Sequence, residues 1–189
     1  MTIIGLSGSL RRGSFNSALL RAAATATPEM AQLTIASLRD IPLYDGDVEE
    51  RDGIPAPVIT LKDAIAAADG LLLVTPEYNN SLPGVLKNAV DWLSRPPADI
   101  ARVFRGKPVA MMGASAGAFG TILAQDAWLP VLRVLGTRPW FEGRLVVSRA
   151  QNVFGPDGTL QDDRVKEQLR QFMQGFVAFV GRSRVEKGG

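Results

Sequence analysis

The 189-residue sequence contains no cysteine and no histidine. Without cysteine there are no disulfides, thiol nucleophiles or cysteine zinc sites, and without histidine there is no imidazole to act as acid, base or metal ligand. Catalysis must therefore rely on other side chains or on a bound cofactor. No apolar run approaches the roughly 20 residues of a membrane-spanning helix, and residues 1–7 lack a basic export segment. We therefore expect a cytoplasmic protein without a membrane partner.

The chain also lacks a large excess of charge of either sign. The chain has 21 Lys+Arg against 19 Asp+Glu, a formal net charge of +2, and its arginines form no dense run. Nucleic-acid-binding segments usually show such a run, so no nucleic-acid partner is predicted. The 46% hydrophobic and 21% charged residues are typical of a globular protein. At this length we predict a single domain spanning residues 1–189.

Short apolar runs alternate along the chain with longer amphipathic ones, a pattern typical of a parallel sheet covered by helices. Five strands are predicted, at residues 2–6, 32–36, 70–75, 109–113 and within 140–147. A helix is expected to start with Ser81 as N-cap and Pro83 in its first turn. The last helix carries a stripe of apolar side chains at Val165, Leu169, Phe172, Phe176 and Phe179.

Five such strands suit the doubly wound order 2-1-3-4-5, with helices on both faces of the sheet. The predicted fold is therefore an α/β three-layer sandwich. In such sheets ligands bind beyond the carboxyl ends of the strands. The loops after the first, third and fourth predicted strands should meet there, and these are the loops richest in Gly, Ser, Asn and Pro.

The loop after the first predicted strand reads GSLRRGSFNS and is dense in hydrogen-bond donors. The hydroxyls of Ser9, Ser14 and Ser17, the amide of Asn16, one arginine and the free N–H groups at a helix start suit a phosphate dianion. An ordinary strand-to-helix turn with capping serines is the alternative. The loop lacks both the lysine of a P-loop and the Rossmann glycine pattern, which disfavours a nucleoside triphosphatase.

The loop after the third predicted strand reads TPEYNNSLPG. Its two prolines stiffen a segment full of donors, and its tyrosine stands beside them. Such an edge suits a planar heterocycle, whereas the alternative is a capped turn with an exposed tyrosine.

The loop after the fourth predicted strand reads GASAGAFG, and Ser115 stands in a G-x-S-x-G pattern. That pattern marks the nucleophile of many hydrolases. The nucleophile needs a general base, usually histidine, so only a lysine-based hydrolase stays open. The same small residues would let a flat ring approach the backbone, with the Ser115 hydroxyl as a donor.

These motifs resemble those of the NADPH-dependent FMN reductases, a family that includes chromate, quinone and ferric reductases. The segments GSLR and SFN of the first loop, and PEYN, PG and LKNA around the second, are similar to the two signature segments of that family. The likeness extends over about the first 120 residues. It implies a flavodoxin-like fold that binds FMN non-covalently.

The resemblance also implies roles for individual residues. Around the FMN phosphate and ribityl chain it places Ser9, Leu10, Arg11, Ser14, Phe15, Asn16 and Ser17. Beside the isoalloxazine it places Pro76, Glu77, Tyr78 and Asn79, with Ser115 and Gly117 on the other side. Tyr78 and Arg95 are candidates for the nicotinamide or acceptor pocket, and Arg95 could instead complement a helix dipole.

The implied activity is ping-pong hydride transfer from NADH or NADPH to flavin N5, and then to a small acceptor. A quinone, azo compound, chromate, ferric chelate or free flavin would suit, and assembly into a homodimer or homotetramer would complete each pocket. A flavodoxin-like electron carrier is an alternative, disfavoured because such carriers need a strongly acidic docking surface. A serine hydrolase using Ser115 is the second alternative.

Overall fold

The computed structural model describes residues 1–188, with side chains through Arg184. Its centre is a six-stranded parallel sheet in the order β2-β1-β3-β4-β5, with β6 also paired to β4. The strands are β1 Thr2–Ser7, β2 Gln32–Ala36, β3 Gly70–Val74, β4 Pro108–Ala114, β5 Arg138–Pro139 and β6 Leu145–Val147. The α-helices are α1 Phe15–Ala26, α2 Gly46–Asp52, α3 Ala56–Ala67, α4 Gly84–Leu93, α5 Ile100–Val103, α6 Ile122–Val134 and α7 Asp163–Gly188.

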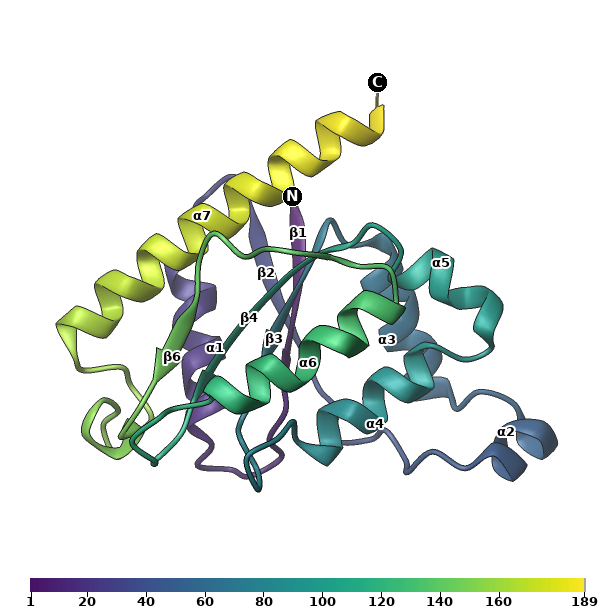
Figure 1. Cartoon of the computed structure of the whole chain (residues 1–189), viewed down its shortest axis with the longest axis horizontal. Helices are drawn as coiled ribbons and strands as arrows, with labels where there is room; N and C mark the ends of the chain where they lie inside the picture. Colours follow the sequence, from purple (N-terminus) through teal and green to yellow (C-terminus); the bar gives the residue numbers. More distant parts are fainter. Residues whose placement is uncertain (189) are drawn as a thin grey trace.

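Helices cover both faces of the sheet (Figure 1), as the sequence predicts. One apolar core joins α1 and α7 to the sheet, and a second joins α3, α4, α5 and α6 to its other face. β3 is buried at all five positions because it lies inside both layers. The predicted order 2-1-3-4-5 and the α/β three-layer class are confirmed.

The fifth predicted strand is divided into two. β6 falls inside the predicted range, whereas β5 precedes it and pairs with the start of β4. Between them the chain leaves the sheet around the buried Trp140, whose ring packs edge-on against Phe172 at 5.1 Å between centroids. A Cβ on Gly143 would stand 2.3 Å from that ring, so only glycine fits beside the indole at this position.

The predicted N-cap of α4 is wrong. The cap position is Pro83, without a side-chain hydrogen bond, and the helix begins at Gly84. Ser81 is engaged elsewhere, because its backbone N–H and C=O both pair with Tyr78 in a tight turn. The stripe on the last helix is confirmed from Leu169 to Phe179, all of whose predicted members are buried, with Val165 partly buried.

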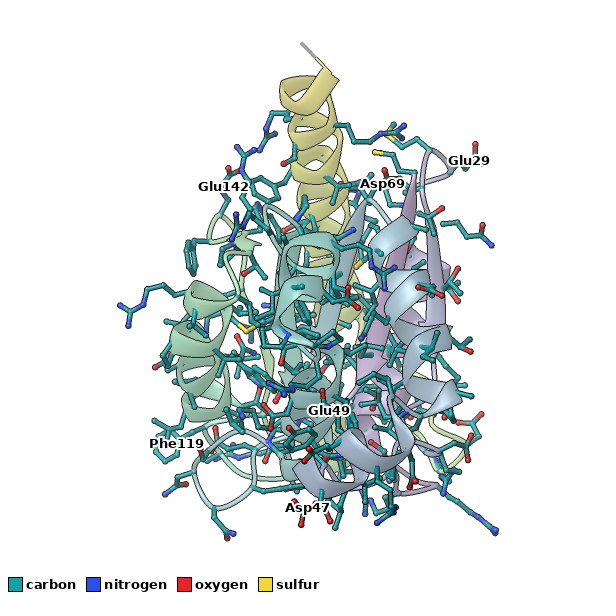
Figure 2. All side chains as sticks on the ribbon, turned by 90° about the vertical axis from the view of Figure 1, so that its right-hand side faces the viewer. Glu29, Asp47, Glu49, Asp69, Phe119 and Glu142 are labelled. Carbon is teal, nitrogen blue, oxygen red and sulfur yellow. The ribbon has the colours of Figure 1, made fainter. Side chains whose placement is uncertain are left out.

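Different residues lie at the carboxyl ends of the strands, called the carboxyl edge of the sheet here, and at their amino ends. Phe119 and Asp47 lie toward the carboxyl ends of the strands, whereas Glu29, Asp69 and Glu142 lie toward the amino ends (Figure 2). Two of the donor-rich loops begin directly after β1 and β3, and the third begins with the last residues of β4. All three therefore lie at the carboxyl edge. Among residues 1–188, no helix has the length and apolarity needed to cross a bilayer.

Candidate functional site

The first and second loops lie directly against each other at the carboxyl edge. The Gly8 N–H donates to the Val74 carbonyl at 2.9 Å. A Cβ on Gly8 would stand 2.8 Å from Pro76 and 2.9 Å from Pro83, so only glycine fits this approach. The Tyr78 hydroxyl lies 3.4 Å from the Ser9 hydroxyl across the same junction. Two loops that are about 70 residues apart in sequence are therefore in direct contact.

The first and third loops are joined by Asn16. Its Nδ2 donates to the Ala114 carbonyl at 2.8 Å, and its Oδ1 accepts from the Ala114 N–H at 2.9 Å. The asparagine is only 4% exposed. This side chain thus joins α1 to the end of β4. Its predicted contact with a phosphate depends on the second Nδ2 hydrogen alone.

The start of α1 carries several hydrogen-bond donors and no acidic side chain. Ser14 is the N-cap and its hydroxyl oxygen accepts from the Ser17 N–H, so the hydroxyl proton is left to donate outward. Ser9 and Ser14 are both buried, and the first turn of α1 contains no acidic residue. The Ser17 hydroxyl pairs with the Ser7 hydroxyl at 3.0 Å, which makes it the least available of the predicted donors.

A cavity of about 460 Å³ opens beside this helix start. Arg12, Ser14 and Phe15 line one side, and Gln151 and Phe154 line the other. Phe15 stacks on Phe154 with ring centroids 5.7 Å apart, and the Arg11 guanidinium lies 5.5 Å from the Phe15 centroid. The sequence analysis missed Gln151 and Phe154. The available signal was their position just after the last strand, at the same edge of the sheet.

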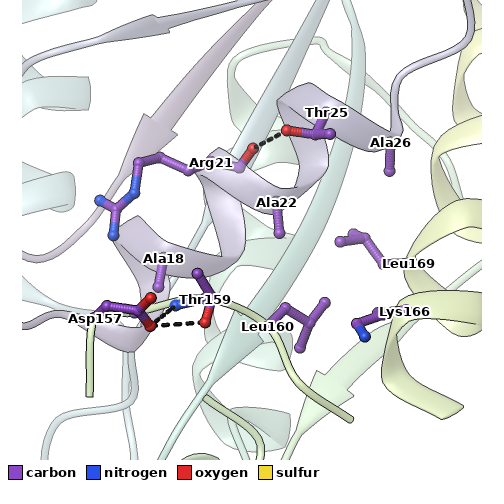
Figure 3. A pocket seen from close by; sticks show the side chains of 11 residues that line it. Ala18, Arg21, Ala22, Thr25, Ala26, Asp157, Thr159, Leu160, Lys166 and Leu169 are labelled. Atoms are coloured by element: carbon purple, nitrogen blue, oxygen red, sulfur yellow. Dashed lines mark hydrogen bonds between the residues drawn. The ribbon is translucent and has the colours of Figure 1, made fainter. Parts of the chain in front are cut away.

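A second cavity of about 420 Å³ continues along α1 toward α7 (Figure 3). It shares Arg21 and the turn at residues 157–158 with the first cavity. Its walls are mainly apolar, from Ala22 on α1 and Leu169 on α7, and Lys166 stands at its margin. The helix that begins at the anion site is therefore bordered by a groove for much of its length.

The second loop ends in a two-residue turn. Tyr78 and Ser81 exchange two backbone hydrogen bonds, at 3.1 and 3.0 Å. Asn79 and Asn80 between them have φ angles of 51° and 59°, and asparagine tolerates this left-handed conformation better than most residues. The turn holds Tyr78 at the rim, 47% exposed.

Glu77 caps another helix. Its Oε2 accepts from the Leu123 and Ala124 N–H groups at 2.9 and 3.1 Å, at the start of α6. A carboxylate is favourable there because free N–H groups and the helix dipole both point at it. Sequence reasoning placed Glu77 beside the isoalloxazine, which stays a prediction. The capping contact spans 46 residues and has no local signal.

Ser115 does not lie in a nucleophile elbow. Its hydroxyl oxygen accepts from the Gly117 N–H at 3.1 Å, and α6 begins only at Ile122, so no sharp strand-to-helix turn carries it. The described lysine side chains contact other groups: Lys62 contacts Asp99, Lys87 contacts Asp91, Lys107 contacts the Ala66 and Ala68 carbonyls, and Lys166 contacts Asp163. The geometry thus leaves Ser115 as a hydrogen-bond donor.

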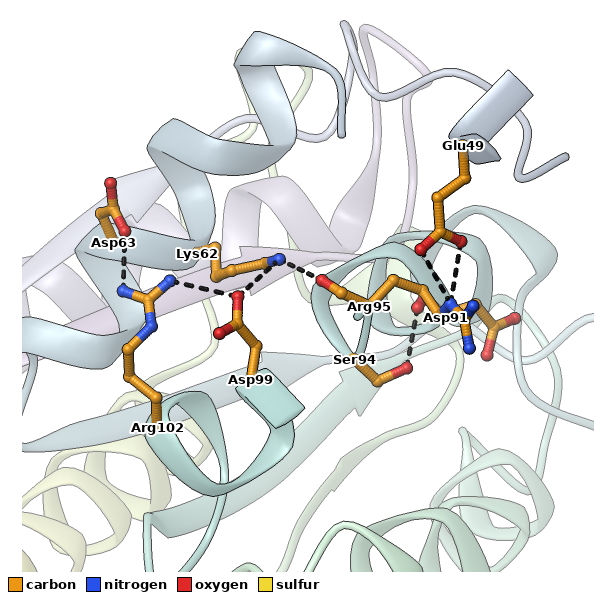
Figure 4. A network of polar contacts seen from close by, with 8 residues as sticks. All are labelled: Glu49, Lys62, Asp63, Asp91, Ser94, Arg95, Asp99 and Arg102. Carbon is orange, nitrogen blue, oxygen red and sulfur yellow. Dashed lines mark hydrogen bonds and ion pairs between the residues drawn. The ribbon is translucent and has the colours of Figure 1, made fainter. Parts of the chain in front are cut away.

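Arg95 points toward α2 (Figure 4). Its Nε donates to both carboxylate oxygens of Glu49, at 3.2 and 2.8 Å. This hydrogen bond is the main reason that the pKa of Glu49 is lowered. Glu49 in turn raises the pKa of Tyr44, because its carboxylate accepts a hydrogen bond from the Tyr44 hydroxyl. α4, with 10 residues, separates Arg95 from the second loop by roughly 15 Å. Of the two candidate pocket residues, only Tyr78 lies among the three loops.

The same network holds the end of α4 to α3 and α5. The buried Lys62 donates to the Arg95 carbonyl and, at 3.1 Å, to Asp99. This bond lowers the pKa of Asp99, which Arg102 also contacts while pairing with Asp63 at 2.8 Å. These contacts explain the position of Arg95 without a ligand.

The sheet order and the helices on both of its faces are those of a flavodoxin-like protein. The family model described as NADPH-dependent FMN reductase matches residues 1–152, and the chain belongs to that family. It is 44% identical to the NAD(P)H-dependent FMN reductase PA1204 of Pseudomonas aeruginosa, over 96% of each chain. It is 37% identical to a quinone reductase of Escherichia coli, over 98% of each chain.

The solved structures include a similar flavoenzyme, the NAD(P)H:(acceptor) oxidoreductase FerB of Paracoccus denitrificans. The TM-score is 0.85 and the identity 31%, over 96% of this chain and 98% of that one. The predicted family, fold class and FMN cofactor are therefore confirmed. The protein is an FMN-dependent NAD(P)H oxidoreductase.

Proposed function

We propose that the carboxyl edge of the sheet binds FMN with its phosphate at the start of α1, and that the protein passes reducing equivalents from NADH or NADPH to a quinone. The observation that carries this proposal is that the three loops meet around the N-terminus of α1, whose first turn contains no acidic residue. Once bound, FMN supplies the redox chemistry by taking a hydride equivalent and giving it up again. The protein then needs neither cysteine nor histidine.

The residues of the first loop bind and orient the cofactor. The Ser9 and Ser14 hydroxyls and the N–H groups at the start of α1 donate to the phosphate, assisted by the helix dipole. Leu10, Arg11 and Phe15 border the ribityl chain. These donors are already in position before the phosphate dianion binds, so little reorganisation of the protein is needed.

The second and third loops enclose the ring. Pro76, the Glu77 backbone, Tyr78 and Asn79 lie along one edge. Ser115 faces them from the third loop, with its hydroxyl proton free to donate to a ring acceptor, and Gly117 leaves space beside it. A fixed donor at that position would stabilise negative charge on the ring as it is reduced.

Similarity to proteins named quinone reductases favours a quinone as the acceptor. The chain is 38% identical to a 2-hydroxy-1,4-benzoquinone reductase of a Burkholderia species, over 94% of this chain and 95% of that one. Tyr78 at 47% and Phe119 at 78% exposure offer aromatic surface at the rim, where a flat acceptor can stack. Nicotinamide and acceptor would occupy the same face in turn, which gives ping-pong kinetics.

We also place the protein in the cytoplasm, as a homodimer or homotetramer. Phe119, Leu123, Leu129 and Phe141 expose apolar surface on and around α6. A second copy packed there would cover this surface and shelter the open side of the site. Light scattering coupled to gel filtration measures the state directly.

The first experiment is the visible spectrum of the purified protein after FMN loading and removal of excess flavin, followed by anaerobic NADH or NADPH. A retained flavin band that bleaches, and recovers with benzoquinone, supports the proposal. Recovery only with chromate, an azo dye, a ferric chelate or free FMN would replace quinone as the substrate. No retained flavin would overturn it, and ester cleavage that Ser115→Ala abolishes would establish the hydrolase instead.

A further inference from the structure

Arg149 has a backbone conformation that does not suit arginine. Its φ and ψ angles are 47° and 45°, in the left-handed region. Glycine adopts this conformation freely and asparagine tolerates it, whereas a long side chain is strained there. Arg149 also stands at the N-cap of the short helix η2, Ala150–Asn152, where it makes no side-chain cap bond. Neither the backbone nor the cap therefore accounts for an arginine here.

The backbone of Arg149 is fixed to the third loop. Its N–H donates to the Gly117 carbonyl at 3.0 Å, and the next N–H, of Ala150, donates to the Ser115 carbonyl at 3.0 Å. Ser115 in turn donates its N–H to Val147 at 3.0 Å. Residues 147–150 thus run alongside the loop that carries Ser115. The unusual conformation is held by three bonds at the edge of the candidate site.

The side chain of Arg149 is exposed and uncompensated. Within the described part of the chain, no carboxylate pairs with it and no hydrogen bond of its guanidinium is found. Some surface arginines do pair, as Arg144 does with Asp126 and Arg182 with Glu142, whereas Arg133 has no partner among the described residues. A strained residue with an unpaired charge beside a site points to a ligand of opposite charge.

We propose that Arg149 binds a phosphate group of the incoming nicotinamide nucleotide and so sets the affinity for that substrate. This inference depends on the proposed function, because it requires the nucleotide to bind beside the third loop. Arginine offers a planar fork of donors that matches phosphate, and its charge also speeds the encounter with an anion. It acts as a binding residue and takes no part in hydride transfer.

The test compares Arg149→Asn with the wild type in the FMN-loaded protein. Asparagine tolerates the left-handed backbone, so this variant should fold with an unchanged Tm. We expect the Kd of NADP⁺ or of 2′,5′-ADP, measured by calorimetry, to rise about tenfold, since a charge-assisted hydrogen bond is lost. The KM of NADPH should rise similarly, while kcat and the KM of the quinone stay within about twofold. Arg149→Lys should recover part of the affinity.

The matched control is Arg133→Asn, which removes an exposed arginine at the far end of α6. A Kd for NADP⁺ that is unchanged in Arg149→Asn, or changed equally in Arg133→Asn, overturns the inference. An effect on the quinone KM alone does so too, as does a clearly lower Tm in Arg149→Asn, which would show that the arginine serves the fold. Because the ligands of the binding assay are not reductants, these failures leave hydride transfer by the wild type intact and are distinct from failure of the proposed function.

Discussion

Asn16 and Ala114 exchange two hydrogen bonds across 98 residues of sequence, at 2.8 and 2.9 Å. The asparagine lies in the first turn of α1, and the alanine is the last residue of β4, where the third loop starts. The N–H and C=O groups of Ala114 that make these bonds are both buried. The position of two of the three site loops thus depends on one side chain.

Replacing Asn16 with alanine should therefore lower both stability and FMN affinity. Two buried backbone groups would lose their partners, and at about 1–3 kcal/mol each we expect a loss of roughly 3 kcal/mol in the free energy of unfolding. Urea unfolding measures that loss, and fluorescence titration measures the FMN Kd. Asn88→Ala is the matched control, since Asn88 also makes two bonds, to Tyr44 and Pro42, away from the site. An Asn16→Ala protein that binds FMN normally would contradict this account.

The approach of the first loop to the second predicts a second effect. Gly8→Ala inserts a methyl group 2.8 Å from Pro76 and 2.9 Å from Pro83, so the loops must separate. We expect a loss of about 1–3 kcal/mol in stability and weaker FMN binding. Gly84→Ala is the control, because its new Cβ meets no atom within 4 Å. Equal behaviour of the two variants in thermal melts would show that the approach is unimportant.

Glu77 offers a test of its capping role. Glu77→Ala leaves the N–H groups of Leu123 and Ala124 without their acceptor, and we expect a stability loss of about 1–2 kcal/mol. Glu77→Gln keeps an acceptor oxygen and loses only the charge, so it should lie between alanine and the wild type. Calorimetric melts of the three proteins give the order. A melt of Glu77→Ala identical to the wild type would exclude the cap.

The Glu49–Arg95 pair predicts a pH dependence. Arg95 lowers the pKa of Glu49 in the folded protein below its ordinary value of 4.5. A depressed carboxyl pKa contributes stability above the unfolded-state pKa, and that stability is lost as the pH falls through the folded-state pKa. The wild type should therefore exceed Glu49→Gln in Tm at pH 7, and the difference should shrink below about pH 4.5. A difference that is constant from pH 7 to pH 3 would contradict the pairing.

Arg95→Ala tests the predicted place of the same residue in the nicotinamide or acceptor pocket, where its charge would attract the anionic nucleotide. A raised KM for NADPH together with a weaker dependence of that KM on ionic strength would support steering. Loss of stability with both quantities unchanged would leave Arg95 as a partner of Glu49 only. Kinetic assays at two salt concentrations separate these results.

The sequence by itself determined the order of the sheet, the apolar stripe of the last helix and the family. The run Leu71-Leu72-Leu73-Val74 is apolar at every position, which only a doubly covered strand allows. The serines of the first loop and the helix after it are neighbours in sequence, so their joint chemistry could be inferred from spacing. The absence of histidine by itself excludes an imidazole base for Ser115.

Only the tertiary structure decided which residues join the loops and which groups the charged side chains contact. Asn16 bonded to Ala114, Glu77 capping α6 and Arg95 paired with Glu49 are contacts between residues 46 or more apart. Periodicity and local propensity carry no information about such pairs, because each partner has many alternatives until the backbone brings two of them within hydrogen-bond distance. The left-handed conformation of Arg149 likewise arises from bonds to a distant loop, and nothing in its neighbouring sequence requires it.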